Sequence, residues 1–441
     1  MKRSNKSYSM KKIIGALVLL IALSPAMAQE SPVRDEQLKG LIQAAVSNYP
    51  RIREMEESLK ADGVKQSIIK AGYLPTATTN ISYRFDAPVA KAEFPLPTGP
   101  ATIQFTPYNN YNAALNVQQL IYDFGRTKLK LGKNDAEHAL NIENLDNSRN
   151  AIAYQVTQLF YNIQFYQKAI QVQADQISSL KENERLIQAR IRNGDALEYD
   201  LLTTQVRTAN ATNRLSDLQS SLEKQYVLMQ WLTATDVRGK IPARESYDEL
   251  TLLMEAGNWQ QVNPEARVLQ KQLDLYQYDL KESTVESRPS LTGTASGGVR
   301  NGYQPDIDQF RLNGSVGVGL NIPILSGDRP RLRQKLTQVQ IDATKASLKT
   351  LENNIQKDLA TVQEDYKNLQ EKIKNTSVLV SQAERAYSLA QVRFKEGLIT
   401  NVELLTAQTN VEDAKLQLVQ LQYQTQLDKL ESHKVVGTKL F

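Results

Sequence analysis

The strongest constraint on the fold is a long internal repeat, whose landmarks keep nearly constant spacing along the 441-residue chain. The landmarks of the first copy are Pro50, Pro75, Gly125 and Gly194, and those of the second are Pro264, Pro289, Gly327 and Gly397. The offset between the copies falls from 214 residues at the prolines to 202 or 203 at the glycines, which indicates one insertion between Pro75 and Gly125. Copies this long indicate a duplicated architecture rather than a short-period solenoid.

The first 28 residues predict a signal peptide. Five basic residues precede an apolar run from Ile13 to Leu23, and the small-residue sequence Ala26-Met27-Ala28 follows it. This pattern is typical of an exported protein. The apolar run is too short to cross a bilayer as a helix, since such a span needs roughly 20 apolar residues. We therefore expect an exported mature chain.

The expected mature chain, residues 29–441, is built from the two repeats. They cover about 35–232 and 247–436, and an equatorial linker with a short helix is expected near 233–263. Each repeat is predicted to run as helix, strand–loop–strand, long helix and return helix.

Charge and cysteine content exclude several classes of site. The chain has 53 basic and 48 acidic residues. All five charged residues of the signal peptide are basic, so the net charge of the mature chain is near zero. The alkaline isoelectric point is therefore no argument for nucleic-acid binding. The absence of cysteine excludes disulfides, thiolate metal sites and lipid attachment through an N-terminal cysteine.

Four short stretches alternate apolar and polar residues with period two. They are Thr76–Phe85, Asn112–Tyr122, Leu291–Arg300 and Phe310–Ile322. One apolar and one polar face over about ten residues is the pattern of a transmembrane β-strand. Any one stretch alone also fits a strand of a soluble sheet. A Pro-rich stretch, Asp86–Tyr111, is predicted to join the first two strands as a long loop.

The rest of the repeat predicts very long helices. The run from Arg126 to Ile191 has no proline and a single glycine, and the run from Asp328 to Phe394 has only Pro330 near its start. Each would be about 100 Å long at 1.5 Å per residue. A return helix of about 36 residues follows each run, with apolar and small residues spaced by three and four, as in a coiled coil. Two further helices are expected at Asp35–Gly72 and Pro264–Ser287. Stacked end to end with a return helix, each would roughly cover the length of one long helix.

Four strands cannot close a barrel by themselves. Strand edges exposed to lipid must be paired, and the smallest known single-chain barrels use eight strands. Several copies of the chain are therefore expected to share one barrel, continued by a tube of helices.

These features resemble the TolC family of outer membrane efflux channels over essentially residues 30–440. The match is carried by Asn48-Tyr49-Pro50 with Asn263-Pro264, by Tyr122-Asp123-Phe124-Gly125 with Leu325-Ser326-Gly327, and by the two tip turns around Gly194 and Gly397. The resemblance implies a mostly α fold with a small β part, in which an antiparallel α-helical coiled-coil barrel continues a 12-stranded β-barrel. Each protomer of the homotrimer would supply four transmembrane strands.

The resemblance also implies a location, a role and partners. The barrel would sit in the outer membrane of a Gram-negative-type cell, with the helical tunnel in the periplasm. The channel would serve a tripartite efflux pump or a type I secretion system, with no cofactor. Its partners would be outer membrane lipid, a periplasmic adaptor (membrane fusion) protein and an inner-membrane transporter of the RND, ABC or MFS class.

The tip turns are the predicted entrance and gate. Basic residues lie four and two positions before each glycine, and an acid lies six after it; these residues are Arg190, Arg192, Arg393, Lys395, Asp200 and Glu403. In a trimer the two acids would form a ring that favours cations. The resemblance singles out Glu403, and places Thr406 where some members have a second acid. Phe394 and Ile399 stand where some members have hydrogen-bonding groups, so any ionic tie would join the four bases to Asp195, Glu198, Asp200, Glu396 or Glu403. A solvated helix end is the alternative interpretation of these charges.

Two other classes of protein fit the sequence less well. An enzyme is disfavoured, because the only histidines, His138 and His433, lack metal-ligand spacing. Gly314, Gly317 and Gly319 fall inside a predicted strand rather than in a phosphate-binding loop. A soluble periplasmic coiled-coil adaptor or scaffold is the main competing hypothesis, although that class has one helical hairpin rather than two, each preceded by a strand pair.

Overall fold

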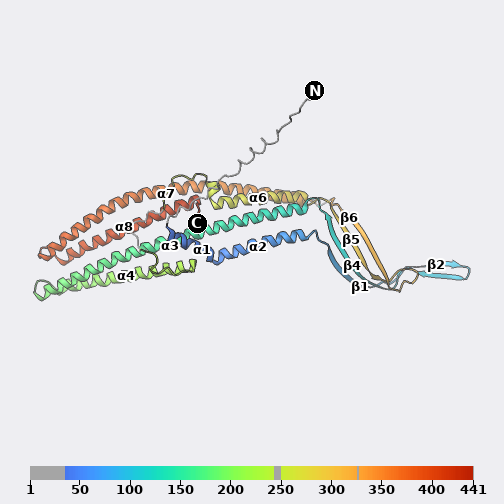
Figure 1. The fold of residues 1–441 in the computed structure, drawn as a ribbon, viewed down its shortest axis with the longest axis horizontal. Helices are drawn as coiled ribbons and strands as arrows, with labels where there is room; N and C mark the ends of the chain where they lie inside the picture. The colour runs from blue at the N-terminus through green and yellow to red at the C-terminus, as the bar shows by residue number, and fades with distance from the viewer. Residues whose placement is uncertain (1–34, 243–249, 325–326, 441) are drawn as a thin grey trace, which may run out of the picture.

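The computed structural model describes residues 35–242, 250–324 and 327–440 (Figure 1). The predicted signal peptide, residues 1–28, and the turn residues Leu325 and Ser326 lie outside this part of the chain. The described part is mostly helical with one four-stranded sheet, as the sequence predicted, and it also contains a two-stranded hairpin.

Two long helical hairpins form the body of the molecule. Helices α3 (Arg126–Arg192) and α7 (Arg329–Lys395) have 67 residues each, and α4 (Glu198–Thr233) and α8 (Asn401–Val436) return along them with 36 each. Small and polar residues are buried along the return helices, among them Thr204, Ala211 and Ala414. Small side chains let the paired helices approach closely, as the predicted seam requires.

Shorter helices lie against the remaining length of α3 and α7. Helix α6 (Pro264–Val285) packs against both, and α2 (Pro50–Ala71) packs against α3 (Figure 1). The prediction of one helix over 35–72 was wrong, because Tyr49 interrupts the helix and separates α1 (Glu36–Asn48) from α2. Tyr49 adopts an extended conformation with ψ of 122°, since Pro50 disfavours helical geometry in the residue before it.

The sheet has the order β1-β4-β5-β6 and is antiparallel throughout. Its strands are β1 (Thr76–Phe85), β4 (Asn109–Tyr122), β5 (Ser290–Arg300) and β6 (Arg311–Asn321), which confirms the four predicted strands to within three residues. Alternate apolar side chains such as Ile81, Leu312 and Val316 are at least 80% exposed. Gly314, Gly317 and Gly319 all lie in β6.

The prediction that Asp86–Tyr111 is a loop was wrong. This stretch contains a hairpin of β2 (Lys91–Leu96) and β3 (Gly99–Gln104), which extends beyond the end of the sheet (Figure 1). The prolines of the stretch argued against strands, but Pro95 and Pro100 face each other in a two-stranded ribbon, where both strands are edges and proline is tolerated.

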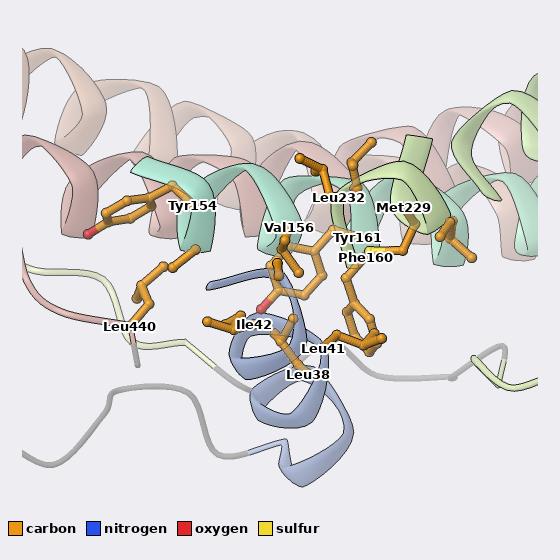
Figure 2. Packing of buried hydrophobic residues seen from close by; sticks show 14 of the residues in the cluster. Leu38, Leu41, Ile42, Tyr154, Val156, Phe160, Tyr161, Met229, Leu232 and Leu440 are labelled. Carbon is orange, nitrogen blue, oxygen red and sulfur yellow. The ribbon is translucent and has the colours of Figure 1, made fainter. Parts of the chain in front are cut away.

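The largest apolar core lies at the middle of the body. Leu38 and Ile42 of α1 point toward Phe160 and Tyr161 of α3, with Met229 and other residues of α4 beside them (Figure 2). The described part of the expected linker closes over this cluster with Val237, Ile241 and Leu250, and it includes the short helix α5 (Trp259–Val262). No helix in the described ranges combines the length and apolarity needed to cross a membrane.

Both histidines take part in packing. The ring of His433 is buried, with its two nitrogens 2.9 Å from the Thr251 carbonyl oxygen and the Thr438 hydroxyl. Burial lowers the pKa of His433. Nδ1 of His138 lies 3.4 Å from Asp62, a buried carboxylate of α2 that also accepts from Asn141 of α3. The His433–Thr251 and His138–Asp62 contacts each join elements far apart in the sequence.

Candidate functional site

The helix tips at the end opposite the sheet form the candidate site (Figure 1). Each hairpin reverses at a glycine with positive φ, 84° at Gly194 and 78° at Gly397. The Asp195 amide donates to the Arg190 carbonyl, and the Leu398 amide donates to the Arg393 carbonyl. This bond closes both helix ends in the same way, and it needs a left-handed residue that glycine supplies without steric cost.

The two predicted entrance acids belong to helix N-terminal caps. The Glu403 carboxylate accepts from the backbone amide and the hydroxyl of Thr400, at 2.7 and 2.8 Å. The Asp200 carboxylate lies 3.4 Å from the Leu197 amide. The bond from the Thr400 amide lowers the pKa of Glu403, which therefore stays charged near neutral pH. The acids thus hold the turns in place and still present negative charge to solvent.

Thr406 contributes no charge to this region. Its hydroxyl donates to the Val402 carbonyl one turn earlier, at 2.7 Å. The side chain is exposed.

Arg190 joins the two hairpins at the tip. Its guanidinium donates from Nη2 to the Lys395 carbonyl at 3.0 Å and lies 4.7 Å from the centre of the Phe394 ring. Phe394 is buried with Ile187 and Leu404 in a small apolar cluster that both hairpins share. The link is therefore a cation–π contact and a hydrogen bond over an apolar base.

The ionic ties that the charge pattern allowed do not form within one chain. In the described ranges, Arg190, Arg192, Arg393 and Lys395 make no ion pair with Asp195, Glu198, Asp200, Glu396 or Glu403. Arg192, Arg393 and Lys395 are exposed. Among the residues that the structure describes, Arg190 alone of the four bases contacts the other hairpin through its side chain, and its partners are a carbonyl and an aromatic ring.

Asn401 makes the second link and was not predicted from the sequence. Its buried amide donates to the Asp200 carbonyl at 3.0 Å and to the Thr204 hydroxyl at 2.9 Å, and its carbonyl accepts from Asn183 at 3.0 Å. The equivalent position of the first copy, 203 residues earlier, is Glu198. This difference between the two copies is the sequence feature that could have pointed to Asn401.

A third link lies about three helical turns further along α8. Glu412 of α8 is 3% exposed, accepts from Gln176 of α3, and lies 3.6 Å from Arg214 of α4. It lines a cavity of about 490 Å³ whose other walls include Leu202 and Val206. Burial raises the pKa of Glu412. The described residues contain no cluster of three His, Asp or Glu side chains that could hold a metal ion.

Comparison with known proteins agrees with this geometry. A model of the family described as "Outer membrane efflux protein" matches residues 41–233 and 257–436. The chain is 18% identical to the outer membrane efflux protein BepC of Brucella suis over 421 residues, which cover 94% of this chain and 87% of BepC.

Solved structures share the fold. The structure of CusC, described as forming a transmembrane channel, has a TM-score of 0.73 at 15% identity and covers 92% of this chain and 94% of its own. The outer membrane protein VceC of Vibrio cholerae has a TM-score of 0.69 at 17% identity, with coverage of 93% and 98%.

Proposed function

Because the chain belongs to the outer membrane efflux protein family, we propose that it forms a passive trimeric channel-tunnel, gated at the helix tips. Members of this family are channels rather than enzymes, and the chain is an outer membrane efflux channel protein. In the proposed trimer, the barrel crosses the outer membrane and the helical tunnel lies in the periplasm. Substrates pass from the periplasm or an inner-membrane transporter to the exterior.

The open edges of the sheet support the proposal that several copies of the chain close one barrel. β1 and β6 are the outer strands of the sheet, and neither has a second partner strand in the described chain. Unpaired strand edges are not tolerated in lipid. Three copies, each pairing its β6 with the β1 of the next, would close a barrel of 12 strands.

The tip contacts support gating by relative movement of the two hairpins. Arg190, Asn401 and Glu412 each join one hairpin to the other through polar bonds. A helical bundle held by a few such bonds has two discrete packings available, and a partner that favours the second one shifts the equilibrium. We propose that breaking these links lets the hairpins separate at the entrance.

The charge of the entrance acids supports a cation preference. The carboxylates of Glu403 and Asp200 lie at matched positions of the two tips, so a trimer carries six of them. A ring of carboxylates lowers the energy of a cation in the opening and raises that of an anion. With Thr406 uncharged, one ring rather than two is expected.

The proposed partners are a periplasmic adaptor protein and an inner-membrane transporter of the RND, ABC or MFS class. The channel itself has no energy source, so export requires a pump that binds substrate and delivers it to the tunnel.

Three measurements test the proposal. Native mass measurement of the detergent-purified protein should give three copies, and the protein should stay in membranes washed with alkaline carbonate. A monomer released by carbonate would instead support the soluble adaptor.

In planar bilayers under a salt gradient, the double variant Asp200→Asn, Glu403→Gln should shift the reversal potential toward that of a nonselective pore. Asp195→Asn, which removes a neighbouring charge that caps no helix, is the matched control. An equal shift in both variants would reject the entrance ring.

A further inference from the structure

The β2–β3 hairpin has one apolar face and one polar face. Ala92 pairs with Ile103, Phe94 with Ala101 and Leu96 with Gly99, so these side chains share a face. On the other face Lys91 pairs with Gln104 and Glu93 with Thr102. This is the pattern of a sheet that is covered on one side.

The apolar face is uncovered in a single chain. Phe94 is 45% exposed, Leu96 51% and Ile103 41%. In the described chain, the hairpin contacts other elements at its base, where Gln304 donates to the Gln104 carbonyl and Lys91 lies 5.6 Å from the centre of the Tyr108 ring. An isolated two-stranded hairpin is marginally stable in water. The hairpin therefore needs a partner for this face.

Membrane lipid does not supply that partner. A tilted strand of about 9–11 residues already spans the hydrocarbon layer, and β1 has ten residues. The hairpin begins at Lys91, after β1 has ended, and extends away from the sheet and helices along the length of the molecule (Figure 1). Its apolar face is thus outside the hydrocarbon layer.

Proline interrupts both edges of the hairpin next to its turn. Leu96 and Gly99 flank a two-residue turn, so they form a hydrogen-bonded pair, and the next pair, Pro95 and Pro100, would point its amides outward. Proline has no amide hydrogen, so both edges lack an outward donor at this level. Proline on an edge strand prevents edge-to-edge association. A partner must therefore cover the face.

We propose that the apolar faces of three hairpins, one from each copy, pack against one another beyond the barrel and form an apolar collar at its exit. The inference rests on the proposed trimer. The hairpin joins β1, the edge strand that pairs with the next copy, to β4, so it stands beside the boundary between subunits. Each trimer then has three identical apolar faces close to its subunit boundaries, and packing them against one another buries all three.

Single-cysteine crosslinking tests the collar, because the chain has no native cysteine. Phe94→Cys places a thiol on the apolar face, and Glu93→Cys places one on the polar face of the same strand. Intact membranes are treated with a short bismaleimide and analysed by denaturing electrophoresis. We expect a covalent dimer, linking two of three subunits, in Phe94→Cys and only monomer in Glu93→Cys. Native mass measurement of each variant reports the trimer independently.

Each outcome decides between the possible occupants. A trimer in which Phe94→Cys stays uncrosslinked overturns the collar and leaves the proposed function standing. Equal crosslinking of both variants also overturns it, since a mobile hairpin has no preferred face. Labelling of Phe94→Cys only by a lipid-soluble maleimide assigns the face to lipid instead. A species other than a trimer removes the proposed function and the collar together.

Discussion

Replacing Arg190 by alanine should weaken the closed state of the channel. The change removes a hydrogen bond from a charged donor to the Lys395 carbonyl, and the contact with the Phe394 ring. A charge-assisted hydrogen bond contributes about 1.5 kcal/mol at the lower end of its range, and a partly exposed cation–π contact contributes about 0.5 kcal/mol. The sum of about 2 kcal/mol per protomer corresponds to a roughly 30-fold shift in the closed-to-open equilibrium of one tip.

The assay is the open probability of single channels in planar bilayers. Arg190→Ala should open more often than the wild type, and Arg190→Lys should fall between them, since lysine keeps the charge but loses the planar group that lies over Phe394. Arg185→Ala is the control, because Arg185 is on the same helix and pairs only with Glu182 of that helix in the described contacts. Equal opening of Arg190→Ala and Arg185→Ala would refute the link, as would no change in Arg190→Ala.

Three further substitutions test packing, polar burial and charge in the same structure. Gly132→Ala would place a Cβ 2.6 Å from Cε1 of Tyr278, so we expect a lower melting temperature by circular dichroism, with a cost of about 1–3 kcal/mol. In a Tyr278→Ala background it should stabilise instead, by about 1 kcal/mol of helix propensity; the same sign in both backgrounds would contradict the clash. Asn401→Ala leaves the buried side-chain amide of Asn183 without its acceptor, so it should cost about 2 kcal/mol and raise the leak current. A variant with unchanged melting temperature and current would show that this link is dispensable. Burial raises the pKa of Glu412, and the charge of Asp413 adds to this rise, whereas Arg214 and Arg207 of α4 oppose it. Because the pKa is raised in the folded state, ionisation of Glu412 destabilises that state as pH rises through the pKa. Glu412→Gln should therefore melt at a higher temperature than the wild type at pH 7.5 and lose this advantage near pH 4. A difference in melting temperature that stays constant across this range would show that ionisation of Glu412 is not its cause.

The sequence predicted those parts of the fold that depend on neighbours along the chain. Helix length follows from the absence of proline over long runs, and α3 and α7 end within one residue of the predicted runs. Strand positions follow from period-two alternation, because a strand with one lipid-facing and one lumen-facing side must alternate. The hairpin was missed because the prolines of Asp86–Tyr111 outweighed an alternating pattern that was present in the sequence.

The tertiary structure alone decided how the tips are joined. Arg190 and Lys395 are 205 residues apart, and the charge pattern suggested that tip bases such as these pair with tip acids, which they do not do in the described chain. Which of four similar bases reaches the other hairpin depends on the rotation of α3 against α7, and no local pattern encodes that rotation. Glu403 and Asp200 could be placed on the tips from spacing, but their capping bonds required the turn geometry. Local periodicity fixes where a chain bends, whereas the packing of distant helices fixes which side chains meet.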